Sequence, residues 1–179
     1  MDLLALAALL RGFFQSHGFP FAFCGGTALG CYGYPFPTFD VDVVTVSDAQ
    51  EELVGFLERE GFLTLHRSPG FSNHLHERLG RVDVVYVRGR TAAELFARVR
   101  RLPGPGGGEV PVVAPEHLVA MKLAAMADDP SRIEVDRVAL AFLLRLPDLA
   151  REEVRGFFER YGFGKLYREL QRGVDVSGT

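Results

Sequence analysis

A pair of glycines and a pair of aspartates carry the strongest chemical signal in this chain. Gly25-Gly26-Thr27 follows the apolar run 21–24, so bare backbone N–H groups stand where a strand gives way to a helix. Such N–H groups, together with the positive end of a helix dipole, favour an anion such as a phosphate. A tight turn that requires positive φ angles is the alternative interpretation of the two glycines.

Asp40 and Asp42 lie two residues apart at the start of a β-branched run that extends to Val46. On a strand, side chains at i and i+2 point to the same face, so the two carboxylates lie side by side. Neighbouring like charges are costly unless a divalent cation neutralises them. A solvated strand end is the alternative, but the intervening residues are aliphatic. The two motifs together predict a site for a nucleotide and a magnesium ion.

This combination resembles the nucleotidyltransferase superfamily, the group related to DNA polymerase beta and the antibiotic nucleotidyltransferases. Its pattern is Gly-Gly-[Ser/Thr/Trp], then Asp-x-Asp, then a third carboxylate on a later strand. The residues 25–29 and 37–42 look most like the AbiEii-type toxins and their relatives, and the resemblance covers about residues 20–145. It implies an α+β fold with a nucleotidyltransferase-like mixed β-sheet flanked by helices and a C-terminal helical part.

The resemblance also implies the roles of the acidic residues. The third carboxylate is Asp83, in phase with Val85 on the run 82–87. Asp40, Asp42 and Asp83 would be both the catalytic residues and the metal ligands, for two Mg²⁺ ions, with Mn²⁺ as an alternative. One ion would hold the triphosphate and the other would activate the attacking hydroxyl. A lone turn carboxylate is the alternative for Asp83.

Four further residues are expected to bind the nucleotide. The resemblance assigns the triphosphate to Gly25, Gly26 and Thr27; for Thr27 a plain helix N-cap is the alternative. Lys122 stands on an otherwise nearly apolar helix, where it would reach the triphosphate or stabilise the carboxylates. A lysine that extends to solvent, or one that pairs with Asp136 to brace helices, is the alternative.

The activity implied is transfer of a nucleoside monophosphate from an NTP to a hydroxyl acceptor. As in some toxins of this type, the acceptor RNA would be the 3′ end of a tRNA, with a cognate antitoxin as partner. Two alternatives are a small-molecule, antibiotic-type nucleotidyltransferase and a catalytically silent nucleotide-binding or partner protein. The silent protein is favoured by Phe36 and Phe39, which occupy positions where relatives carry basic residues.

Composition limits the other classes of function. The chain has 179 residues, 47% of them hydrophobic, and a net charge of −3, so it can bury a core and has no general attraction to nucleic acid. No apolar stretch reaches membrane-spanning length and the N-terminus lacks a basic leader, so we expect no membrane partner and a cytoplasmic location. Cys24 and Cys31 are expected to be buried reduced thiols.

The order of elements predicts one compact domain. Strands dominate a nucleotidyltransferase core over 1–114, helices form a C-terminal part over 115–172 packed on that core, and 173–179 form a frayed tail. Ser47 and Gln50 are expected to form a capping box, and 103–108 a flexible loop. The predicted strands are 20–24, 40–46, 62–67, 72–78, 82–87 and 110–113, and the predicted helices are 2–16, 27–32, 49–60, 91–100, 115–127, 132–145 and 149–171.

Two weaker patterns have structural interpretations. His74 and His76 share one face of a strand, a metal-compatible arrangement without a third ligand at recognisable spacing. Arginines at 67, 78, 88, 90, 98, 100 and 101, together with His66, would line a groove for a polyanion. A solvated surface explains them equally and is the preferred interpretation.

Overall fold

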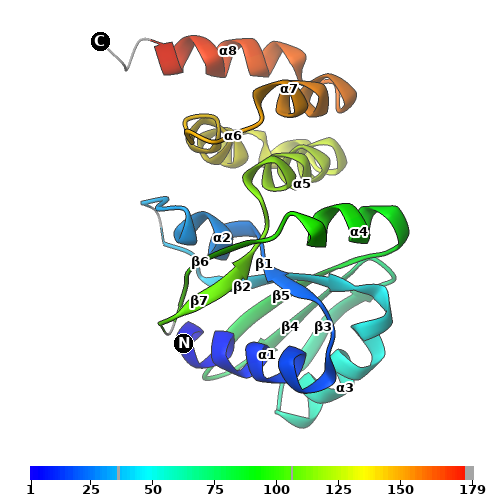
Figure 1. Cartoon of the computed structure of the whole chain (residues 1–179). Helices are drawn as coiled ribbons and strands as arrows, with labels where there is room; N and C mark the ends of the chain where they lie inside the picture. The colour runs from blue at the N-terminus through cyan, green and yellow to red at the C-terminus, as the bar shows by residue number, and fades with distance from the viewer. Residues whose placement is uncertain (36, 106, 176–179) are drawn as a thin grey trace. The chain divides into compact units, whose positions relative to one another are not determined.

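The computed structural model describes residues 1–35, 37–105 and 107–175 (Figure 1). The chain divides into a first unit, Met1–Val113, and a second unit that begins at Ala114. The first unit combines one mixed sheet with helices and the second is helical, which confirms the predicted α+β class. Of the predicted tail, 173–175 belong to the last helix and 176–179 lie outside the described residues.

The first unit is built on a seven-stranded sheet in the order β3-β4-β5-β2-β1-β7-β6. Strands β2 and β5 pair in parallel, as do β1 and β7, and the other neighbours are antiparallel. The alternating burial along β5 shows one face packed in the core and one only partly covered. The strands are β1 (Phe21–Phe23), β2 (Asp40–Val46), β3 (Leu63–Ser68), β4 (Phe71–His76), β5 (Gly80–Val87), β6 (Arg100–Pro103) and β7 (Glu109–Val112).

Helices cover both faces of this sheet (Figure 1). Helices α1 (Leu3–His17) and α3 (Gln50–Arg59) lie on one face, and α2 (Gly25–Cys31) and α4 (Gly89–Ala97) lie on the other. The face beneath α1 is apolar because the buried positions of β2 and β5 are mostly valines. The strand faces that carry Asp40 and Asp42 therefore point away from α1, toward the side of α2.

The described part of the second unit, 114–175, contains four α-helices and a short 3-10 helix over Pro130–Arg132. Pro115 occupies the first turn of its first helix, where a missing N–H has no consequence. The prediction of a single helix over 149–171 is wrong. Gly162 adopts φ 81° and the Phe163 N–H bonds to the Phe158 carbonyl, which ends the helix. The helices are α5 (Pro115–Asp128), α6 (Ile133–Leu143), α7 (Arg151–Arg160) and α8 (Gly164–Asp175).

Strand β6 replaces the end of a predicted helix. The helix expected over 91–100 ends at Ala97, and β6 pairs antiparallel with β7. The expected flexible loop 103–108 connects these two strands as a hairpin, in which the Gly104 N–H bonds to the Gly108 carbonyl. Residue 106 lies outside the described residues. Pairing with β7 fixes β6 although its own sequence has little strand propensity.

The predicted capping box is also wrong. The Ser47 hydroxyl donates to the Val87 carbonyl, and the Gln50 amide donates to the Ser68 carbonyl. Neither side chain caps α3, because a 3-10 turn over Ser47–Ala49 precedes it. These two hydrogen bonds instead attach the start of α3 to neighbouring strands.

Two further expectations concern the cysteines and membranes. Cys24 and Cys31 form no disulfide in the part of the chain that the structure describes, and of the two Cys24 is buried. Cys31 is partly exposed, because it ends the short helix α2, and its partial burial raises the pKa of the thiol. Among the described residues, no helix has the length and apolar character needed to cross a bilayer.

Candidate functional site

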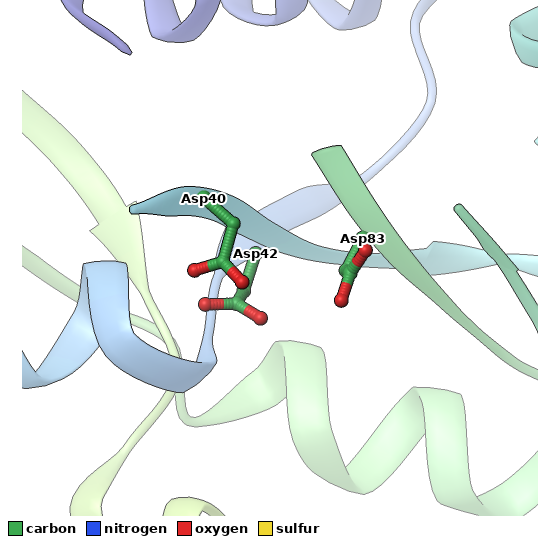
Figure 2. A group of neighbouring side chains, drawn as sticks. All are labelled: Asp40, Asp42 and Asp83. Carbon is green, nitrogen blue, oxygen red and sulfur yellow. The ribbon is translucent and has the colours of Figure 1, made fainter. Parts of the chain in front are cut away.

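Three carboxylates converge at the partly covered face of the sheet (Figure 2). Strands β2 and β5 run in parallel, and their register places Asp42 directly opposite Asp83 and Asp40 opposite Arg81. Directly paired residues share a face, so Asp40, Asp42 and Asp83 project to the same side. One oxygen from each carboxylate lies within 4.8 Å of the others. The predicted convergence is confirmed; the catalytic roles stay predictions.

The glycine pair makes room for these carboxylates. A Cβ on Gly25 would lie 2.3 Å from the Asp42 carboxyl carbon, and one on Gly26 would lie 2.5 Å from the Thr38 hydroxyl oxygen. Gly25 also adopts φ +49°, which residues with side chains rarely adopt. The Gly26 N–H donates to Asp42 Oδ2 at 2.8 Å. The two glycines therefore allow the start of α2 to lie close against β2. Phosphate binding by this motif stays a prediction.

Thr27 also links the start of α2 to β2 by hydrogen bonds. It is buried, and its hydroxyl accepts from the Asp42 N–H at 3.1 Å and donates to the Asp40 carbonyl at 3.4 Å. Helix α2 begins at Gly25 rather than at the predicted position 27, so Thr27 lies inside the first turn and is not its N-cap. Its hydroxyl holds the backbone of both aspartates in place, and contact of Thr27 with a nucleotide stays a prediction.

Asp42 is the electrostatically strained member of the cluster. Burial disfavours its ionised form, and repulsion from Asp40 and then Asp83 adds to this, which raises its pKa to about 7. Hydrogen bonds from the backbone of Gly26 and Thr27 offset part of the shift. A bound divalent cation would reverse it, because a nearby positive charge favours the ionised carboxylate.

This shift predicts how the stability of the metal-free protein depends on pH. The folded pKa of Asp42, about 7, lies above the unfolded value of about 3.9. Stability contributed by this group is therefore complete below about pH 4 and is lost as the pH rises through about 7. In chelator-treated protein we expect the melting temperature of the parent to fall relative to Asp42→Asn between about pH 5 and about pH 8. Parallel profiles for the two proteins would contradict the shift.

Two residues outside the predicted set orient the carboxylates. The Thr38 hydroxyl donates to Asp40 Oδ1 at 2.7 Å. Arg81 donates from Nε to Asp83 Oδ1 at 2.7 Å and from Nη2 to Oδ2 at 3.0 Å. Each is two residues from the aspartate that it contacts, a spacing that places Arg81 and Asp83 on one face of β5. That spacing is the sequence signal that identifies Arg81.

The oxygen set suits a hard divalent cation. Asp40 Oδ1 accepts from the Thr38 hydroxyl and Asp42 Oδ2 accepts from the Gly26 N–H, so both carboxylates are held by neutral donors. Carboxylate oxygens are the usual ligands of Mg²⁺ and Mn²⁺. Because the three carboxylates lie close together, they could hold such a metal.

The structure places Lys122 in an ion pair. Lys122 Nζ lies 2.6 Å from Asp136 Oδ1, and Arg132 Nε lies 3.2 Å from Asp136 Oδ2. The side chains of Lys122 and Asp136 are 15% and 3% exposed, so this pair between α5 and α6 is largely buried. The bracing alternative is thus present in the second unit, and the predicted contact of Lys122 with a nucleotide stays untested.

Breaking this pair should destabilise the protein. Lys122→Met removes the less exposed of the two cations that contact the buried Asp136 carboxylate among the described residues, and leaves the half-exposed Arg132. Removal of one partner of a buried pair typically costs about 3–5 kcal/mol. We expect a melting temperature several degrees lower, measured by circular dichroism. Lys165→Met is the matched control, because Lys165 is the other lysine of the chain and is 87% exposed. Equal melting of the two variants would contradict a bracing role.

The remaining sequence candidates do not join the carboxylates. His74 is buried, with Nδ1 hydrogen-bonded to Thr64 and Nε2 to Ser72, and His76 Nδ1 accepts from the backbone of the following turn. These hydrogen bonds engage both nitrogens of His74, which removes the metal interpretation of the pair. Phe39 is 71% exposed, and Phe36 lies outside the described residues.

Comparison with known proteins places this site in a recognisable fold. No family model matches the sequence, and no curated protein matches it. The solution structure of the antibiotic-resistance factor ANT(2'')-Ia matches with a TM-score of 0.64 and 17% identity over 97% of this chain and 98% of that chain. Its crystal structure with adenylyl-2''-tobramycin matches with a TM-score of 0.56 and 13% identity over 98% of both chains.

A third match is an antigenic nucleotidyltransferase-like protein from Paracoccidioides brasiliensis. Its TM-score is 0.60 at 16% identity, over 98% of this chain and 90% of that chain. All three matches span nearly the whole of both chains, so the likeness is one of complete architecture. Particular closeness to AbiEii-type toxins does not follow from them. The chain has a nucleotidyltransferase-like fold, as its sequence predicted.

Proposed function

We propose that this protein transfers a nucleoside monophosphate from an NTP to a hydroxyl group in a metal-dependent reaction. The observation that carries the proposal is the convergence of Asp40, Asp42 and Asp83 within 4.8 Å, beside the backbone of Gly25 and Gly26. Three partly buried carboxylates at this distance repel one another unless cations neutralise them. The nucleotidyltransferase-like fold supports the same reaction class.

In the proposed reaction, the acceptor oxygen attacks the α-phosphorus of the NTP, the bond from that phosphorus to the bridging oxygen breaks, and pyrophosphate leaves. Bound Mg²⁺ would neutralise the phosphate charge and lower the pKa of the attacking hydroxyl. Asp40 and Asp42 would hold the metal, and Asp83 would complete the site and accept the hydroxyl proton. The backbone at Gly25–Thr27 would bind the triphosphate.

The acceptor distinguishes two candidate functions. From the resemblance to AbiEii-type toxins we propose the 3′ end of a tRNA, with a cognate antitoxin as protein partner. A small hydroxylated molecule is the second candidate, since the chain matches ANT(2'')-Ia, solved with adenylyl-2''-tobramycin, over 98% of both chains. A binding protein without activity is the third outcome, consistent with the exposed Phe39 at a position where relatives carry a basic residue.

The test supplies each NTP labelled at the α-phosphate, with Mg²⁺ and with either total tRNA or a panel of aminoglycosides. Label that joins RNA supports the toxin reading, and label that joins an aminoglycoside supports the small-molecule reading. Asp42→Ala tests whether transfer depends on the site. Its matched control is Asp48→Ala, because Asp48 is an exposed aspartate of the same unit. No transfer to any acceptor, with NTP binding retained, would leave the silent binding protein as the conclusion.

A further inference from the structure

Arg81 binds the Asp83 carboxylate, which a second metal ion would need as a ligand. Its guanidinium donates to both oxygens of Asp83, at 2.7 and 3.0 Å, in the bidentate geometry that makes arginine–carboxylate pairs strong. The Asp83 side chain is 17% exposed, so this pair is partly shielded from water. Asp40 and Asp42 also act on the Arg81 guanidinium electrostatically. Arg81 is therefore the counterion of the carboxylate cluster.

The two halves of the site therefore differ in the charge of the groups that donate hydrogen bonds to their carboxylates. The donors to Asp40 and Asp42 are neutral: the Thr38 hydroxyl bonds to Asp40, and the backbone N–H groups of Gly26 and Thr27 bond to Asp42. Both oxygens of Asp83 accept from a cation. A metal ion that approaches Asp83 meets a full positive charge at hydrogen-bond distance from its ligand atoms. Among the residues that the structure describes, no cationic side chain is hydrogen-bonded to Asp40 or Asp42 in this way.

We infer that Arg81 is a positioning residue that competes with a metal ion for Asp83. This inference rests on the metal site of the proposed function and adds an order of filling to it. The pair Asp40 and Asp42 binds the first ion, and Asp83 becomes a ligand only when Arg81 leaves it. The Arg81 side chain has room to move away from Asp83, because it is 43% exposed. Once released, its charge is available to a polyanion such as a triphosphate.

Manganese binding tests the competition without any reference to activity. Mn²⁺ is titrated by electron paramagnetic resonance and calorimetry, without nucleotide, into the parent, Arg81→Gln, Arg81→Lys and Arg78→Gln. Arg78 is an exposed arginine of the turn before β5, so its replacement measures the general effect of one lost charge. We expect the weaker Mn²⁺ site to tighten by about tenfold or more in Arg81→Gln, because the charge-assisted bidentate contact that competes with the ion for Asp83 is lost.

Two variants exclude a merely structural effect. Arg81→Lys keeps the charge but loses the bidentate contact, so its Mn²⁺ affinity should lie between those of the parent and Arg81→Gln. Arg81→Gln combined with Asp83→Asn should lose the gain, because the competed ligand is then gone. A gain that persists in the double variant would overturn the inference, since the ion would not be using Asp83.

The remaining outcomes separate the inference from the function on which it rests. Equal Mn²⁺ affinity in the parent and Arg81→Gln, with binding lost in Asp42→Ala, would overturn the competition and leave the metal site intact. Absence of Mn²⁺ binding in all of these proteins would overturn the metal site and the competition together. Equal gains in Arg81→Gln and Arg78→Gln would reduce Arg81 to a general surface charge and would also overturn it.

Discussion

Asp42→Ala is expected to abolish metal-dependent nucleotide binding and to reduce nucleotidyl transfer by at least about 100-fold. Even the outer hydrogen-bond partners of a metal ligand typically contribute 10- to 100-fold, and Asp42 would be a direct ligand. Asp42 is also directly opposite Asp83 and accepts from the Gly26 N–H, so its loss disrupts both sides of the site. Calorimetry with Mg²⁺ and NTP, and transfer of an α-phosphate label, measure the two effects.

The same substitution should not unfold the metal-free protein. An ionised Asp42 is destabilising there, because burial and two neighbouring carboxylates raise its pKa to about 7. We expect Asp42→Ala to melt at the parental temperature or above it at pH 8, whereas Asp48→Ala should match the parent in melting, metal binding and transfer. Parental NTP affinity in Asp42→Ala, with Mg²⁺ present, would contradict the site.

Gly25→Ala is expected to produce the second large effect. A Cβ at this position would lie 2.3 Å from the Asp42 carboxyl carbon, and the φ of +49° is unfavourable for alanine. Backbone strain of this kind costs about 1–3 kcal/mol, and the displacement of Asp42 should weaken Mn²⁺ binding as well. Thermal melting and Mn²⁺ titration of the same preparation measure the two consequences.

A neighbouring glycine is the control for this prediction. Gly30 lies in the same helix, and a Cβ there would meet nothing within 4 Å. Gly30→Ala should therefore leave melting and Mn²⁺ affinity unchanged, or raise stability by about 0.4–1 kcal/mol through the unfolded state. If Gly25→Ala and Gly30→Ala behave alike, the close approach of Gly25 to Asp42 does not govern the site.

The positions of the aspartates could be predicted from local pattern. Asp40 and Asp42 follow the two-residue period of a strand, and Asp83 stands in phase with Val85 on another. Once two such strands pair in parallel, register brings Asp42 opposite Asp83. The two-residue period of a strand can be read from the sequence itself, and for this reason the shared face of the aspartates was predictable.

Contacts between distant segments were not predictable in the same way. Gln50 satisfies the capping pattern but donates to Ser68, eighteen residues away, because strand carbonyls at the sheet end compete for it. Strand β6 contains two arginines and a proline and forms because β7 is available to pair with it. The bidentate contact of Arg81 with Asp83 follows a readable spacing, although the competition for Asp83 emerges only from the geometry.

A crystal structure with Mn²⁺ and a non-hydrolysable NTP would show directly which carboxylates hold the metal, because anomalous scattering locates the manganese. We expect an anomalous peak between the carboxylates of Asp40 and Asp42, and a triphosphate against the backbone of Gly25–Thr27. Anomalous peaks only at other carboxylates, or a nucleotide bound away from Gly25–Thr27, would contradict the proposed site.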